Sequence, residues 1–133
     1  MDIIQIERDL TAYFADIFAL EVDKSIFRGS VPAGKSGIAV IVDTPVYSEI
    51  PHLPIQYNIQ LLGSFKDRDE AMRFLAKAWN IFPLADIELS SCKVLRISTR
   101  GSGSVFQAPD SGKIKYQASI NLFAVILTTG KQI

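Results

Sequence analysis

The stretch from Leu53 to Phe82 reads LPIQYNIQLLGSFKDRDEAMRFLAKAWNIF, and it decides the fold that we predict for the chain. Its first half alternates apolar and amide side chains, with Ile55, Tyr57, Ile59 and Leu61 between Gln56, Asn58 and Gln60. Successive side chains of a strand point to opposite faces, so this half predicts a strand with one apolar face and one uncharged polar face. The polar face is either an ordinary solvated surface or one that meets a partner.

The second half of the stretch predicts an amphipathic helix that begins after Asp67. The Asp67 side chain can accept a hydrogen bond from a free N–H of the first turn, and Glu70 can reach back, as in a capping box. Apolar residues then recur at steps of three and four: Ala71, Phe74, Leu75, Ala78 and Phe82. The change of period across Gly63–Lys66 predicts a turn there, with the helix folded back onto the apolar face of the strand.

Length and composition favour one domain, residues 1–133, with one core, because the chain has 133 residues. Fourteen acidic and fourteen basic residues give zero net charge. This balance disfavours a free-standing nucleic-acid-binding domain, since phosphate contacts dominate the affinity of such domains. The mean hydropathy of +0.21 indicates either a well-filled core or apolar surface buried between subunits.

The reactive residue types limit the chemistry. One cysteine forms no intrachain disulfide framework, and with one histidine it cannot complete a closed Cys/His zinc site. The N-terminus lacks the pattern of a signal peptide, and no apolar run reaches the ~20 residues that span a bilayer. We therefore expect a cytosolic protein with no cofactor, metal or membrane contact. No acid, base and nucleophile converge in the sequence, so we expect no enzyme activity.

The other elements are predicted from the same strand and helix periodicities. Residues 2–19 predict a helix that Asp2 can cap, and Ile38–Asp43 predicts a strand that is apolar on both faces. Residues 44–53 contain two prolines and a lone His52, which we interpret as structural, and predict a loop or extended arm. The sequence also predicts a strand at 90–100, with a bulge at Val94–Leu95, and a strand at 113–128. Shorter extended pieces are expected at 25–28 and 105–108. Turns are expected at 83–88 and 109–112, and a flexible link at 101–104.

Together these elements predict an α+β fold. We expect a mostly antiparallel sheet of about four to five strands with two helices packed on one face. The predicted order is α-β-β-β-α-β-β.

A literal phosphate-loop pattern, G-x-x-x-x-G-K-S, runs from Gly29 to Ser36 and raises one alternative function. A true phosphate loop opens a helix, whose N-terminus helps to hold the phosphate. Here a strand pattern follows at Gly37, and Pro32 removes one donor N–H. A small ligand- or nucleotide-binding α+β domain that uses this loop stays the alternative with the weaker support.

Three features together resemble the tail terminator proteins of long-tailed bacteriophages, a family also described as minor capsid, tail-completion or head–tail joining proteins. They are the run Phe27–Pro32 leading into Gly37–Asp43, the strand Ile55–Leu62 followed by the helix Asp67–Trp79, and the final strand pair around Pro109–Lys113. In many relatives the last turn resembles Asp-x-x-Gly-Arg, whereas here Asp110, Gly112 and Lys113 stand closer together. The resemblance covers about residues 2–126 as an order of elements.

The resemblance implies a structural role. Members of this family form a ring, usually a hexamer, that caps the tail tube, stops its polymerisation and joins the tail to the head. The implied partners are other copies of the chain, the tail tube protein, the head–tail connector and DNA in transit. The implied location is the host bacterial cytoplasm during assembly and the virion neck or tail afterwards. A head-side connector or neck adaptor of the same assembly is a second interpretation.

Two sets of residues are candidates for these contacts. A head-to-tail interface needs apolar or amide-rich sheet surface, and the candidates for it are Val40, Val42, Gln56, Asn58, Gln60, Phe123 and Val125. Passage of DNA through a ring calls for weak, sequence-independent basic contacts, and the candidates in or beside loops are Lys35, Arg100, Lys113 and Lys115. For each of these four residues the simpler interpretation is an ordinary solvated side chain.

Overall fold

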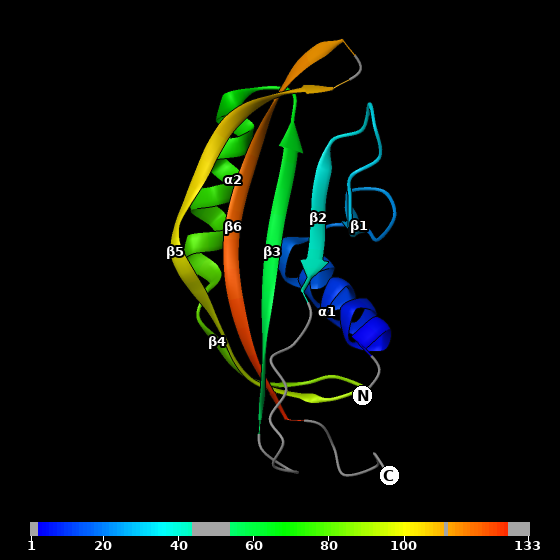
Figure 1. The fold of residues 1–133 in the computed structure, drawn as a ribbon, viewed down its shortest axis with the longest axis vertical. Helices are drawn as coiled ribbons and strands as arrows, with labels where there is room; N and C mark the ends of the chain where they lie inside the picture. Colours follow the sequence, from blue (N-terminus) through cyan, green and yellow to red (C-terminus); the bar gives the residue numbers. More distant parts are fainter. Residues whose placement is uncertain (1–2, 44–53, 111, 128–133) are drawn as a thin grey trace.

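The computed structural model describes residues 3–43, 54–110 and 112–127. These residues form two helices and six strands (Figure 1). In chain order they are α1 (Ile3–Phe18), β1 (Ile26–Arg28), β2 (Gly37–Val42), β3 (Ile55–Phe65), α2 (Arg68–Ile81), β4 (Leu84–Glu88), β5 (Lys93–Asp110) and β6 (Lys113–Leu127).

All six strands belong to one sheet in the order β1-β2-β3-β6-β5-β4. Strands β1 and β2 are parallel, and the other neighbours are antiparallel. The two helices lie on the same side of this curled sheet, behind it in the view of Figure 1. The predicted α+β class is therefore confirmed. The predicted four to five strands are corrected to six, and the sheet is mixed.

The core lies between the sheet and the helices. The alternate β3 residues Tyr57, Ile59 and Leu61 are buried, and they meet the buried helix residues Ile6, Leu10, Phe14, Ala71, Phe74 and Ala78. The apolar strand face and the apolar helix stripe are thus confirmed. The cap of α2 is confirmed as well, because the Asp67 side chain accepts a hydrogen bond of 2.8 Å from the backbone N–H of Glu70. The capping role proposed for Asp2 lies outside the described residues.

Two predicted links are strands instead. Residues 84–88 form β4, although we predicted a turn there. Ile87 is the only buried side chain of this strand, so the sequence shows no alternation of apolar residues there. The strand is also irregular, because Asp86 has a φ of 55°. The supposed flexible link at 101–104 lies inside β5, where a register shift between Arg100 and Ser104 accommodates it. The bulge predicted near Val94–Leu95 is confirmed by a shift between Val94 and Arg96.

Two predicted turns are also wrong in extent. Strand β3 continues through Gly63 to Phe65, because β6 pairs with it as far as Tyr116. At the other end of β6, Pro109 pairs with Ile114 and Asp110 pairs with Lys113, so β5 continues to Asp110. The long strand β6 thus gives its neighbours a partner beyond the points at which their own sequences indicate a stop.

Candidate functional site on the open face of the sheet

Most of the predicted contact residues come together on the sheet face that points away from the helices. We call this surface the open face and define it by Ile41, Gln56, Asn58, Gln60, Leu62, Arg96, Ser98, Arg100, Gln117, Ser119, Asn121, Phe123 and Val125. Strand register places Asn58 opposite Phe123 and Gln56 opposite Val125. The open face is turned toward the viewer in Figure 1, and neither α1 nor α2 covers it.

Short contacts hold several side chains of the open face in place. Gln60 Nε2 donates a hydrogen bond to Ser119 Oγ at 2.9 Å, and Arg96 Nε donates one to Ser98 Oγ at 2.7 Å. The Arg100 guanidinium lies 5.5 Å from the centre of the Phe123 ring, within the range of a cation–π interaction. The open face is therefore a partly ordered polar surface before any partner binds.

The charge of the open face is positive. Arg96 and Arg100 are exposed, and none of the residues that define the face is acidic. Asp43, which follows β2, is an exposed acidic residue at its border. Amides, hydroxyls and arginines form hydrogen bonds with polar or anionic partners, but they offer no group that exchanges protons near neutral pH.

The structure corrects the role proposed for Val40. Its side chain is 0% exposed and belongs to the core, so it does not reach a surface where a subunit could touch it. Val42 lies on the same side of β2 and packs against the core while partly exposed. The intervening residue Ile41 is the one that faces the open side, opposite Gln60. The sequence did not distinguish these sides, because the strand is apolar at every position.

The four basic candidates fall into three environments. Arg100 lies on the open face, and Lys35 and Lys113 are exposed in the loop before β2 and at the start of β6. Lys115 is only 6% exposed, and its Nζ donates a 2.5 Å hydrogen bond to the backbone oxygen of Lys35. The proposal that Lys115 contacts DNA is therefore wrong, because its ammonium group is buried beneath the loop that it holds.

The loop from Gly29 to Ser36 lacks the geometry of a phosphate loop. It connects β1 directly to β2, and no helix follows it. The backbone N–H groups of Gly29, Ser30 and Lys35 already donate to the oxygens of Val40, Arg28 and Pro32, at 2.9, 3.0 and 3.1 Å. These amides cannot also form an anion-binding cradle.

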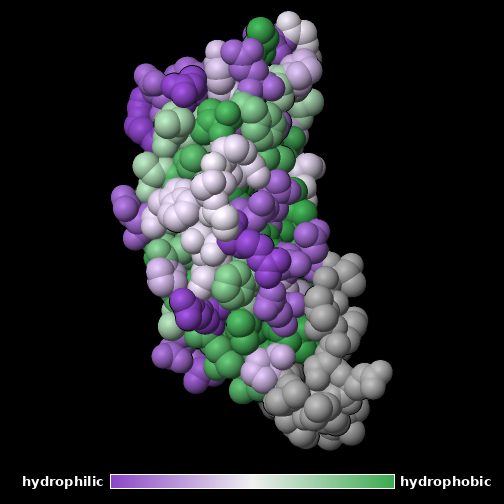
Figure 2. All heavy atoms as spheres, turned by 60° about the vertical axis from the view of Figure 1, so that its left-hand side comes forward, coloured by the Kyte–Doolittle hydropathy of each residue, from purple (hydrophilic) through white to green (hydrophobic). Residues whose placement is uncertain are grey.

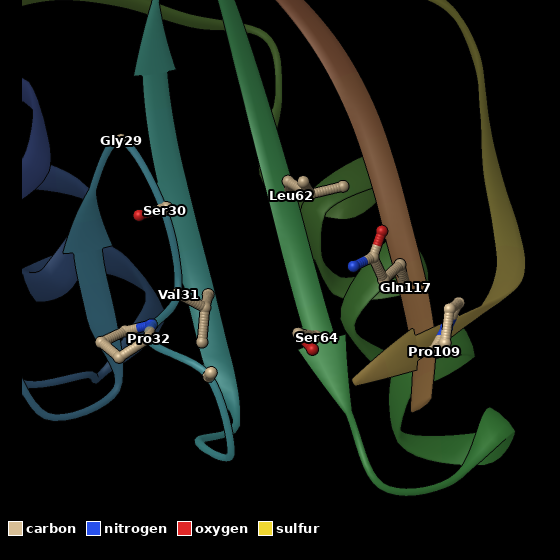
Figure 3. A pocket seen from close by; sticks show the side chains of 9 residues that line it. Gly29, Ser30, Val31, Pro32, Leu62, Ser64, Pro109 and Gln117 are labelled. Carbon is tan, nitrogen blue, oxygen red and sulfur yellow. The ribbon is translucent and has the colours of Figure 1, made fainter. Parts of the chain in front are cut away.

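A pocket of about 280 Å³ lies where this loop passes over the end of the open face. Loop residues 29–33 form one wall, and Leu62, Ser64, Gln117 and Pro109 form the other (Figure 3). None of these lining residues carries a charge or titrates near neutral pH. The pocket can therefore receive a small neutral group, such as a partner's side chain, but it offers no acid or base for catalysis.

The remaining reactive groups form no site. Cys92 is fully buried, and burial raises the pKa of its thiol. Among the residues that the structure describes, no group of three His, Cys, Asp or Glu side chains could hold a metal, and His52 lies outside them. Within the same residues, neither helix is long and apolar enough to cross a membrane.

No protein-family model matches the chain, and no curated protein matches it significantly. Any functional proposal therefore depends on the geometry of the open face and on the resemblance of the sequence.

Proposed function

We propose that this chain is a tail terminator, a structural protein of a bacteriophage or prophage that forms a ring, caps the tail tube and joins the tail to the head. The resemblance of the sequence suggests the role. The observation that supports it is the grouping of Gln56, Asn58, Gln60, Phe123 and Val125, with Arg100 beside them, on one uncovered sheet face. We propose that the open face meets the other components of the assembly.

The chemistry of the open face suits that task. Its two arginines attract phosphate without reading a base sequence, which is what DNA in transit requires. Its amides and hydroxyls bind polar protein surface.

Native mass from light scattering, combined with binding to purified tail tubes, tests the proposal. We expect the wild-type protein to form a closed ring or to add to tube ends. Asn121→Lys places a bulky charge in the middle of the open face and should abolish both properties. Asn80→Lys, the same change at an exposed position of α2, should leave both unchanged.

The contrary outcomes separate the alternatives. A monomer that ignores tubes would overturn the terminator assignment, and binding to heads instead would favour the connector or neck adaptor. An intact ring in Asn121→Lys would show that the open face is not the contact surface. A rise in Tm on addition of a nucleotide would favour the Gly29–Ser36 alternative.

A further inference from the structure

Strand β5 leaves a long edge of the sheet without a partner. Strand β4 pairs with β5 only between Lys93 and Ile97. From Ser98 to Asp110, no strand among the described residues lies on the outer side of β5. Figure 1 shows the first part of this segment at the border of the sheet, above β4, and its last part curling across the top of the sheet. Its outward backbone N–H and C=O groups are therefore available to another strand.

At the opposite edge of the sheet, the chain itself engages several outward backbone groups of β1. Ser25 and Gly29 bond to β2, so Ile26 and Arg28 of β1 present their backbone groups outward. Ile26 N donates to Glu21 O at 3.1 Å, Ile26 O accepts from Asp23 N at 2.8 Å, and Arg28 O accepts from Ser30 N at 3.0 Å. Three outward groups of β1 are thus engaged, whereas Ser98–Asp110 of β5 is the longest edge segment that has no strand beside it among the described residues.

The surroundings of the β5 edge leave room for a partner and supply apolar surface. On the helix side, Met72 and Trp79 of α2 are 42% and 41% exposed. They lie on the flank of α2 that also carries Leu75, which packs next to Gly103 of β5. On the open-face side, Phe106 is 43% exposed. Figure 2 turns this side of the molecule forward and shows apolar residues, interspersed with hydrophilic ones, around a pale centre.

We propose that two copies of this chain associate in solution through this edge, with β5 of one copy antiparallel to β5 of the other. An antiparallel edge is self-complementary, because a two-fold rotation brings the same row of donors and acceptors face to face. Features that hinder edge pairing are Arg100, the bulge at Gly101–Gly103 and Pro109. The regular segment Ser104–Asp110 carries the pairing, with Gln107 at its middle.

This contact is separate from the proposed ring. A two-fold contact joins like surfaces, whereas a cyclic ring repeats a contact between unlike surfaces. The edge contact therefore describes the free protein, and the open face remains available for the ring. The two proposals can fail independently.

A cysteine at the two-fold axis tests the geometry. Residues that face each other across an antiparallel pair have Cβ atoms about 4.5–5.5 Å apart, close to the distance that a disulfide spans. Gln107→Cys should therefore give a covalent dimer on mild oxidation, seen on a non-reducing gel. Asn80→Cys, which is exposed on α2, should not. The native Cys92 is buried and contributes no cross-link.

A charge on the edge tests the energetics. Phe106→Lys places one lysine on each side of the axis and should raise the dimer dissociation constant at least tenfold, measured by sedimentation across a concentration series. Val22→Lys, at a residue 44% exposed and distant from β5, should change it less than twofold. A wild-type protein that stays monomeric would overturn the proposal. So would an assembly, hexameric or other, that tolerates Phe106→Lys and shows no cross-link through Gln107→Cys.

Discussion

At the scale of single residues, Asp9 ties the loop between β4 and β5 to helix α1. Its Oδ2 accepts hydrogen bonds from Ser90 Oγ at 2.9 Å and from Ser91 N and Oγ at 3.0 and 2.5 Å, while Oδ1 accepts one from Gln5 Nε2 at 2.9 Å. Burial alone would raise the pKa of this carboxyl, but the hydrogen bonds outweigh it and lower the pKa. The ionised form is therefore the one that stabilises the folded chain.

The lowered pKa sets the direction of a pH effect. A carboxyl whose pKa falls on folding stabilises the protein above its unfolded pKa, about 3.9, and this contribution is lost as pH falls through the folded pKa. Asp9→Asn should lower the free energy of unfolding in urea at pH 7 by about 1 kcal/mol, because the amide has one acceptor oxygen where the carboxylate has two. The difference in unfolding free energy between wild type and Asp9→Asn should therefore shrink as the pH falls below the unfolded pKa. An equal difference at pH 7 and in acid would contradict this, and Asp16→Asn, exposed on α1, is the control.

Gly103 is a second residue whose identity the packing dictates. A Cβ added there would lie 2.8 Å from the backbone oxygen of Ser119 and 2.3 Å from Leu75 Cδ1. The Leu75 side chain can move, but the backbone of β6 cannot, so Gly103→Ala should lower the free energy of unfolding by roughly 1–3 kcal/mol. Urea denaturation measures this. Ser102→Ala, at the exposed neighbouring position, should stay within about 0.5 kcal/mol, and equal losses in both variants would contradict the argument.

At the scale of elements, the loop between β1 and β2 is held from below by Lys115. Its hydrogen bond to the Lys35 oxygen joins β6 to a segment far away in the sequence. Lys115→Met keeps most of the buried stem but removes the donor, so it should cost about 1 kcal/mol and speed amide exchange in residues 29–37. Hydrogen-exchange mass spectrometry measures the second effect. Lys113→Met changes an exposed side chain and should leave the loop protected as in wild type.

Elements with a clear period could be predicted from the sequence, and elements defined by a neighbour could not. The polar side of β3 follows from strict alternation, which is why Gln56, Asn58 and Gln60 fall on the open face as a group. Arg96 was missed because the bulge before it moves its side chain to the open face. Lys115 has the period of an exposed residue, yet a distant loop covers it. Such contacts arise only when separate segments meet.

At the scale of the whole molecule, aromatic rings join the two helices into one layer. The ring centres of Phe14 and Phe18 in α1 lie 6.1 and 6.5 Å from the ring centre of Phe82. The ring centre of Phe18 also lies 5.6 Å from that of Phe74 in α2. Phe74 in turn lies 5.7 Å from Phe65 of β3. Because one cluster connects both helices with the sheet, we expect them to unfold together.

Phe14→Ala tests this cooperativity. Removing a fully buried ring should lower the free energy of unfolding by about 3–5 kcal/mol, whereas Ile4→Ala, at a residue 54% exposed, should change it by less than about 0.5 kcal/mol. The single tryptophan, Trp79, reports on α2, and far-UV circular dichroism reports on the whole backbone. Both signals should give one urea midpoint in wild type and one lower midpoint in Phe14→Ala. A Trp79 transition that precedes the loss of circular dichroism would show that α2 separates from the rest, and that the chain holds more than one cooperative unit.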